Sequence, residues 1–370
     1  MWIDERMTRR GVLRAGIGGV ASIYLAGCGG GSGGGSNGGE GGDASLNWLT
    51  WSDHYAKDQL ASVQRATGIG AKPTLQSDNA EGYLKLKQSG GQWDMISADA
   101  LWAPKENAEG LTASFDIAEI GASSELFPFA REMPFWRDGG NTMAYPFGWS
   151  SVQLCYDPRE VSPAPTSWEV LLDKRYAGKV IANNQPTDLM AVGGLATGAS
   201  EPYDMTPEEI DRARDFLREA KPAFLTLAAD DSQIVRALAD GSATMAIANL
   251  GMDYRVKDAG GPQLKMATPR EGVFGFIDGE QLVKASDKEA AFLRFLDAME
   301  RAEWIAANFM ANSRPLFNEK AYKLLVDQGQ QERADRLLYN KPEQALEMTL
   351  KGPSGDVQAY TEAFNEVFGA

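Results

Sequence analysis

LNWLTWSDHYAKDQLASVQRATG, residues 46–68, decides the fold of this chain. Its beginning, Leu46–Trp51, predicts a β-strand, and Lys57–Thr67 predicts a helix that Gly68 ends. A strand followed at once by a helix of this length is the basic unit of an α/β domain. The stretch therefore predicts a strand and helix that open a layered α/β fold.

The same alternation continues along the chain. We expect strands over 93–97, 151–156, 179–182 and 243–248, and helices over 80–88, 103–110, 168–172, 207–220, 232–240, 286–298, 301–310 and 319–328. Thr206 and Asn318 are the expected N-caps of two of these helices. Alternating strands and helices are typical of parallel sheets with helices on both faces.

The N-terminal segment has the features of an export signal. Arg9 and Arg10 form a twin-arginine run, and a weakly apolar stretch over 15–26 follows. That stretch is too short to span a bilayer, which takes roughly 20 apolar residues. It ends in Leu-Ala-Gly before Cys28, which resembles a bacterial lipobox. We therefore expect a signal peptide over 1–27 and a lipid on Cys28 that anchors the chain to a membrane.

Residues 28–45 are mostly glycine with a few polar residues, a composition that cannot bury apolar surface. They predict a tether between the anchor and the folded part.

The net charge is −15, which argues against nucleic acid as a partner, because nucleic acid attracts clustered Lys and Arg. A periplasmic or cell-surface location, anchored through Cys28, is the predicted localisation.

The sequence lacks the common signs of catalysis. It has a single histidine, His54, and outside the glycine-rich tether it has no G-x-S-x-G motif, phosphate-binding loop or zinc-binding spacing. Cys155 lies in an apolar run and predicts a buried small side chain. We therefore expect a binding protein, not an enzyme, with no cofactor and no metal. An exported enzyme that uses acidic residues remains the alternative.

Several collinear motifs resemble the spermidine/putrescine-binding proteins, which are the solute receptors of polyamine ABC importers. The motifs are LTWSDHY (49–55), ATGI (66–69), GYLKL (82–86), WDM (93–95), YPFGW (145–149), TSWEVL (166–171), YAGKV (176–180) and PREG (269–272) followed by FID (276–278). Their order and spacing hold from about residue 46 to about residue 320. The resemblance covers most of the chain that follows the tether.

The resemblance implies a two-lobed periplasmic-binding-protein fold of type II. Each lobe is then a mostly parallel sheet flanked by helices, and the ligand lies in the cleft between the lobes. The implied division assigns residues 46–152 and 278–318 to lobe one and residues 153–277 and 319–370 to lobe two. The implied partners are a small-molecule ligand and an ABC permease.

The resemblance also carries ligand-binding roles to single positions. The candidate residues are Trp51, Asp53, His54, Tyr55, Asp188, Asn249, Phe276 and Asp278. The acids Asp188 and Asp278 would each hold one amine, and Phe276 would cover the methylenes between them. Taken without the resemblance, Asp188 can also be a helix cap, Asp278 a turn residue, and Trp51 or Phe276 a core residue.

Some positions depart from the family pattern. Asn249 stands where the family has a second tryptophan, and Asp99, Leu101 and Asn312 stand where other residues are usual. The aromatic lining is therefore thinner than in the spermidine receptors. A polyamine is the first prediction, and another small cationic or polar solute is the alternative. A signalling or scaffold lipoprotein with the same fold is a second alternative, and an iron-binding relative is disfavoured because the chain has no adjacent tyrosine pair.

Overall fold

A computed structural model describes residues 44–89 and 91–369 of the protein. The predicted signal peptide, Cys28 and the tether up to residue 43 lie outside these ranges. The first strand begins at Ala44, two residues before its predicted start. Within the described ranges, no helix combines the length and the apolar character that a bilayer crossing requires.

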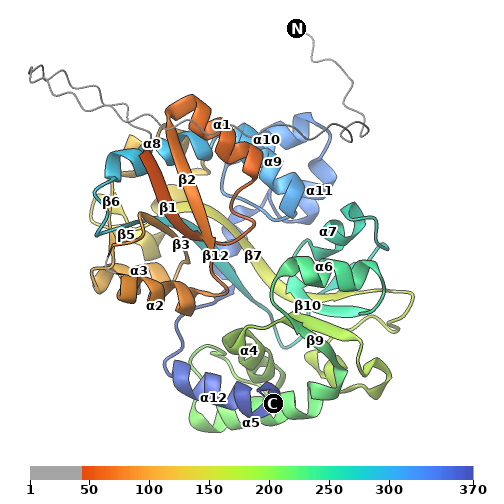
Figure 1. Ribbon diagram of the computed structural model, residues 1–370. Helices are drawn as coiled ribbons and strands as arrows, with labels where there is room; N and C mark the ends of the chain where they lie inside the picture. The colour runs from red at the N-terminus through yellow and green to blue at the C-terminus, as the bar shows by residue number, and fades with distance from the viewer. Residues whose placement is uncertain (1–43, 90, 370) are drawn as a thin grey trace, which may run out of the picture. The chain divides into compact units, whose positions relative to one another are not determined.

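The first half of the main sheet is built from parallel strands. β1 (Ala44–Thr50) lies between β2 (Ile69–Leu75) and β3 (Met95–Asp99) and is parallel to both. Four helices accompany these strands (Figure 1): α1 (Lys57–Thr67), α2 (Asn79–Ser89), α3 (Trp102–Ala108) and α8 (Glu289–Met299). The helix predicted over Lys57–Thr67 is confirmed with the same bounds, and it ends at Gly68, whose φ of 72° is left-handed.

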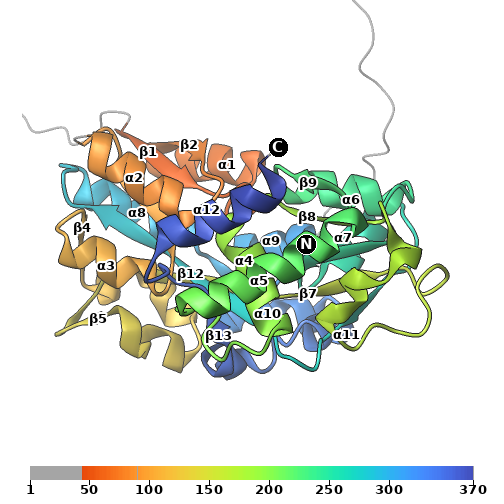
Figure 2. The same cartoon turned by 90° about the horizontal axis from the view of Figure 1, so that it is seen from below.

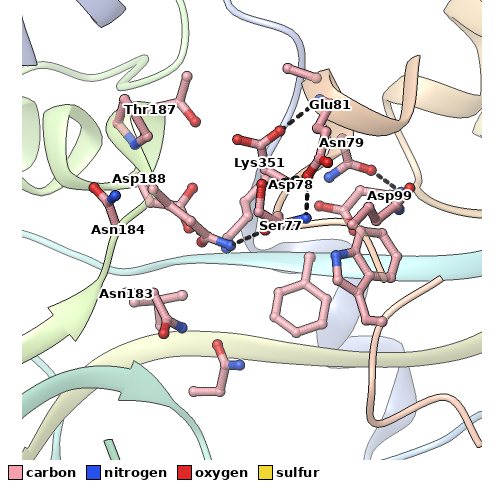
Figure 3. A pocket seen from close by; sticks show the side chains of 18 of the residues that line it. Ser77, Asp78, Asn79, Glu81, Asp99, Asn183, Asn184, Thr187, Asp188 and Lys351 are labelled. Atoms are coloured by element: carbon pink, nitrogen blue, oxygen red, sulfur yellow. Dashed lines mark hydrogen bonds and ion pairs between the residues drawn. The ribbon is translucent and has the colours of Figure 1, made fainter. Parts of the chain in front are cut away.

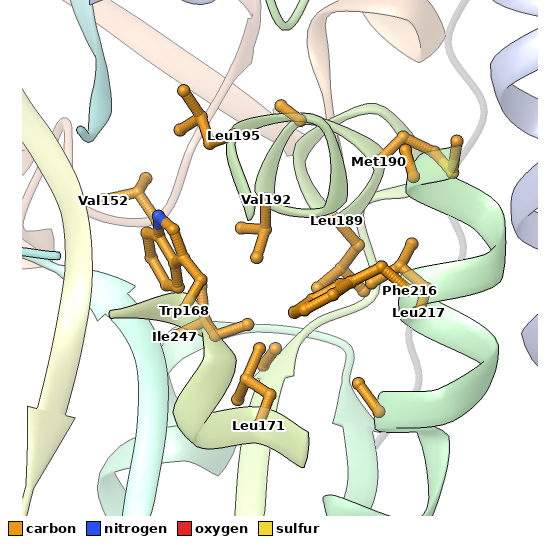
Figure 4. Close-up of a cluster of buried hydrophobic side chains, with 14 of the residues drawn as sticks. Val152, Trp168, Leu171, Leu189, Met190, Val192, Leu195, Phe216, Leu217 and Ile247 are labelled. Carbon is orange, nitrogen blue, oxygen red and sulfur yellow. The ribbon is translucent and has the colours of Figure 1, made fainter. Parts of the chain in front are cut away.

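The second half repeats this arrangement. β8 (Val180–Asn183) lies between β10 (Met245–Asn249) and β9 (Phe224–Ala228) and is parallel to both. Its helices are α4 (Pro186–Ala196), α5 (Pro207–Ala220), α6 (Asp231–Ala239) and α7 (Met252–Asp258). Trp168, Leu189 and Phe216 belong to the large apolar core that α4 and α5 bury (Figure 4). The predicted cap of α5 is confirmed, because the hydroxyl of Thr206 accepts from the backbone N–H of Glu209.

Two long antiparallel strands, β7 (Tyr145–Tyr156) and β12 (Phe274–Val283), join the halves. β12 also pairs with β3, and β7 also pairs with β10, so each strand belongs to both halves. The predicted strand over 151–156 was therefore too short at its start. The register between β7 and β12 shifts beside Gly279, opposite Pro146, and such irregularities accommodate a proline that cannot donate to a ladder.

Shorter elements complete the sheet and its connections. The short strands are β4 (Thr112–Ala113), β11 (Lys265–Ala267) and β13 (Thr349–Leu350) on the main sheet, and β5 (Arg137–Asp138) with β6 (Asn141–Thr142) as a separate pair. The 3-10 helices are η1 (Ile117–Glu119), η2 (Gly121–Glu125), η3 (Pro128–Glu132), η4 (Pro134–Trp136), η5 (Trp168–Leu172), η6 (Lys174–Tyr176), η7 (Lys221–Ala223) and η8 (Pro342–Glu347). η5 has the bounds predicted for a short helix at 168–172.

The C-terminal helices pack in two places. α9 (Ala302–Asn312), α10 (Glu319–Asp327) and α11 (Gln331–Arg336) form an apolar cluster against Phe147 of β7. α12 (Val357–Phe368) packs on α4 and α5 of the second half (Figure 2). Asn318 caps α10 as predicted, since its side chain accepts from the Ala321 N–H at 2.8 Å. The lobe boundaries stay a prediction.

Candidate ligand-binding cleft

A cavity of about 470 Å³ lies where the carboxyl ends of the parallel strands in the two halves meet. The loops that follow β1, β2, β8 and β9 line it, as does the last residue of β3, Asp99. Ligands of open α/β sheets bind at this end of the strands. The amide of Gln185 donates to the backbone carbonyl of Ser77 at 3.0 Å, which links the two walls of the cleft.

Asp278 lies in the middle of β12 and is almost completely buried. Arg314 Nη1 lies 3.0 Å and His54 Nε2 lies 3.1 Å from Asp278 Oδ2. The other ring nitrogen of His54 lies 2.6 Å from Glu280 Oε1 on the same strand. The Gly148 N–H donates to Asp278 Oδ1 at 3.1 Å. Two basic groups of the protein therefore already contact this carboxylate.

The pKa of His54 is raised within this network. Burial alone would lower the pKa of the imidazole, but the carboxylates of Asp278 and Glu280 outweigh it and raise the pKa to about 10. A protonated His54 donates from both ring nitrogens, which suits a position between two carboxylates. The guanidinium of Arg314 also lies 3.2 Å from Asp53 Oδ2, so Asp53 in the loop after β1 is paired as well.

Asp188 lies in the first turn of α4 and also has a basic partner. Lys351, which follows β13, forms an ion pair with Asp188 Oδ2, and the Tyr203 hydroxyl donates to Oδ1 at 2.8 Å. The side chains of Lys351 and Asp188 are 14% and 15% exposed. Lys351 Nζ also lies over the ring of Phe276, 5.2 Å from its centroid. Figure 3 shows Lys351 between the residues of the two walls.

Asp99, at the end of β3, differs from these two acids. It is 5% exposed, and its backbone N–H donates to Asn79 Oδ1 at 2.9 Å. Among the described residues no basic side chain forms an ion pair with its carboxylate. Burial raises its pKa to about 7, and the charge of Asp278 adds to this, while Lys351 opposes it. A buried carboxyl group with a pKa near neutrality and no ion-pair partner is suited to accept a cationic group from outside the protein.

The remaining acids that line the cavity have other partners. Asp78 and Asp230 accept backbone N–H groups at the start of α2 and α6, and Glu81 pairs with Lys85 at 2.6 Å. Asp231 pairs with Arg255 at 2.5 Å and accepts from Asn183. Asp99 is thus the lining acid, within the described chain, that neither caps a helix nor has a basic partner.

The structure separates the predicted site residues into two groups. The residues that line the cavity are Trp51, Asp53, Asp188, Asn249, Phe276 and Asp278. His54 and Tyr55, which were predicted to bind the ligand, are not among the residues that line it. The ring of His54 stacks on Phe147 with 4.2 Å between centroids, and Tyr55 packs against Trp48. The loop after β1 therefore turns both rings inward, towards the protein.

Three lining residues have roles that the sequence reading missed. Lys351 and Arg314 are the basic partners of Asp188 and Asp278, and they lie 163 and 36 residues away from those acids. Asp99 departs from the family pattern, and the family motifs carry no ligand-binding role to it. Asp188 does not cap α4, whose N-cap is Gln185, and Asp278 lies in a strand and not in a turn. The described residues contain no group of His, Cys, Asp and Glu arranged to hold a metal ion.

Comparison with known proteins identifies the type of molecule. The family model for bacterial extracellular solute-binding proteins matches residues 60–330. The putrescine-binding periplasmic protein SpuD of Pseudomonas aeruginosa is 22% identical over 277 residues, which cover 70% of this chain and 75% of SpuD. The putrescine-binding periplasmic protein PotF of Escherichia coli is 23% identical over 279 residues, which cover 71% of this chain and 75% of PotF.

Solved structures give the same fold. A Listeria monocytogenes structure described as a spermidine/putrescine ABC transporter superposes with a TM-score of 0.77 at 19% identity. The match covers 88% of this chain and 97% of that one. At this level of identity the likeness establishes the fold alone. It confirms the two-lobed arrangement that the sequence motifs implied.

Proposed function

The chain belongs to the family of bacterial extracellular solute-binding proteins, and we propose that its cleft captures a small aliphatic amine, with polyamines as the first class to test. In this proposal the protein is the extracytoplasmic receptor of an ABC importer and delivers the solute to a permease. A lipid on Cys28 and the glycine-rich tether would keep the receptor at the membrane. The names of SpuD and PotF, both putrescine-binding, support the choice of ligand class.

The observation that carries the proposal is Asp99. A buried carboxylate without a basic partner is unfavourable, and an ammonium group supplies the missing charge. Charge-assisted hydrogen bonds of this kind contribute about 1.5–3 kcal/mol each. Trp51, Trp102 and Phe276 line the same cavity and supply aromatic surface for the methylenes of an amine. Cation–π contacts with such rings add roughly 0.5–2 kcal/mol.

A second candidate ligand is another small cationic or polar solute. It is favoured by the pairing of Asp188 with Lys351 and of Asp278 with Arg314 and His54. Both acids were expected to hold ligand amines, and both have intramolecular partners. A ligand with fewer positive charges than putrescine is therefore compatible with the same cleft.

The test is a thermal-shift panel on the purified protein. Putrescine, spermidine and aliphatic monoamines form one arm, and neutral sugars and dicarboxylates form the other. We expect only the amines to raise the melting temperature, because a ligand that binds only the folded state stabilises it. Asp99→Asn should weaken amine binding roughly 100-fold, since it leaves the ammonium without its counter-charge.

Asp327→Asn is the matched control, because Asp327 is an exposed acid at the end of α10. It should leave the amine shift unchanged. A shift with sugars or dicarboxylates and none with any amine would contradict the proposed ligand class. An unchanged amine shift in Asp99→Asn would contradict the role of this carboxylate.

A further inference from the structure

Lys351 has a position in the cleft that a flexible surface lysine does not have. It directly follows β13, which pairs with β12, and its own backbone N–H donates to the Gly275 carbonyl at 2.7 Å. The backbone is therefore fixed at the wall of the cavity. From there the side chain lines the cleft and reaches across to α4, which belongs to the second half (Figure 3).

The ammonium group of Lys351 has the surroundings that a bound amine would have. It forms an ion pair with Asp188, and its Nζ lies 5.2 Å from the ring centroid of Phe276 and 5.7 Å from that of Phe274. A carboxylate at the charge and aromatic faces beside it are the groups that recognise an alkylammonium ion. Lys351 thus fills one ammonium position of the cleft with a group that belongs to the protein.

Groups of the protein already contact most acids of the cleft. Asp188, Asp231 and Asp278 each have a basic partner, and Asp78 and Asp230 accept backbone N–H groups at helix starts. Asp99 has neither within the described chain, although the charge of Lys351 acts on it. A diamine would bring one ammonium to Asp99 and a second one to a region that already holds Lys351. Like charges at such a distance repel each other strongly in a poorly solvated cleft.

We infer that Lys351 is a specificity-determining residue that makes the cleft select amines with a single ammonium group and an uncharged hydrogen-bond acceptor at the other end. The inference rests on the proposed function and narrows it. The ammonium of the ligand pairs with Asp99. Lysine has three N–H donors, and Asp188 is the one ion-pair partner that the described residues provide, so Lys351 can also donate to the ligand acceptor.

The test compares two ligands of the same chain length by titration calorimetry. The probes are putrescine, with two ammonium groups, and N-acetylputrescine, in which one nitrogen is an amide. We expect the wild-type protein to bind N-acetylputrescine at least tenfold more tightly than putrescine. In Lys351→Met the preference should reverse, because the second ammonium of putrescine can then pair with Asp188.

Two further variants complete the design. Lys341→Met removes an exposed lysine and should keep the wild-type preference. Adding Asp188→Asn to Lys351→Met should abolish the gain in putrescine affinity. Tighter binding of putrescine than of N-acetylputrescine by the wild-type protein would overturn the inference and leave the proposed function standing. Binding of neither amine, with binding of another solute class, would overturn both.

Discussion

The acids on the two walls of the cleft differ in whether a basic side chain of the protein pairs with them. On the wall formed by β3, Asp99 is buried and lacks a basic partner among the described residues. On the wall formed by α4, Asp188 is held by Lys351 and by the Tyr203 hydroxyl. Both acids line the same cavity, and of the two only Asp188 forms an ion pair with a basic side chain of the described residues. The number of acids that line a cleft therefore does not give the charge of its ligand.

Asp278 extends the comparison to the strand that joins the two halves. It touches Arg314, His54 and the Gly148 N–H, and its side chain is 2% exposed. All these partners come from the protein itself. We interpret Asp278 and its basic partners as a structural ion cluster where β7 and β12 pair. We propose that Asp99 is the acid that pairs with the cationic group of the ligand.

The largest expected effect is the loss of stability in Asp278→Asn. Removing this charge leaves Arg314 and His54 with less compensation in a buried site. Breaking a buried ion pair in this way costs roughly 3–5 kcal/mol. Denaturant unfolding of the ligand-free protein should report the loss. A stable Asp278→Asn protein with strongly reduced amine affinity would instead show that Asp278 binds the ligand. It would contradict the distinction drawn between Asp278 and Asp99.

The smallest expected effect is that of Asn249→Ala. Asn249 lines the cavity at the end of β10, but its amide donates only a 3.5 Å hydrogen bond to Asp231, which Arg255 also holds. We expect the amine affinity, measured by calorimetry, to change less than threefold. A loss of amine affinity above tenfold would indicate that Asn249 contacts the ligand directly. The second half of the sheet would then contribute more to ligand binding than we expect.

Local sequence signals predicted much of the fold. Thr206 followed by Pro207, and Asn318 before α10, mark helix starts through hydrogen bonds to backbone groups three residues away. β7 was harder to delimit. Pro146 and Gly148 argue against a central strand, yet β7 begins at Tyr145 and its register against β12 shifts between Gly148 and Pro146.

The candidate site was less predictable for a related reason. The family motifs placed Trp51, Asp188 and Phe276 at the cavity wall, because those residues lie in recognisable stretches. The pairing of an acid with Lys351 or Arg314 depends on contacts between distant parts of the chain, and no local pattern encodes it. The sequence alone therefore predicts Asp188 and Asp278 as acids that bind the ligand.

The most direct test of the central claim is the number of protons released when an amine binds. Burial raises the pKa of Asp99 from 3.8 to about 7, so the carboxyl group is partly protonated near neutral pH. An ammonium ligand favours the ionised carboxylate and drives the proton off, and affinity should rise as the pH rises from 6 to 8. Titration of N-acetylputrescine at pH 7, in buffers with different ionisation enthalpies, should show proton release in the wild-type protein and none in Asp99→Asn. Equal proton release in the two proteins, or none in the wild type, would contradict the assignment of Asp99 as the acid that binds the ligand.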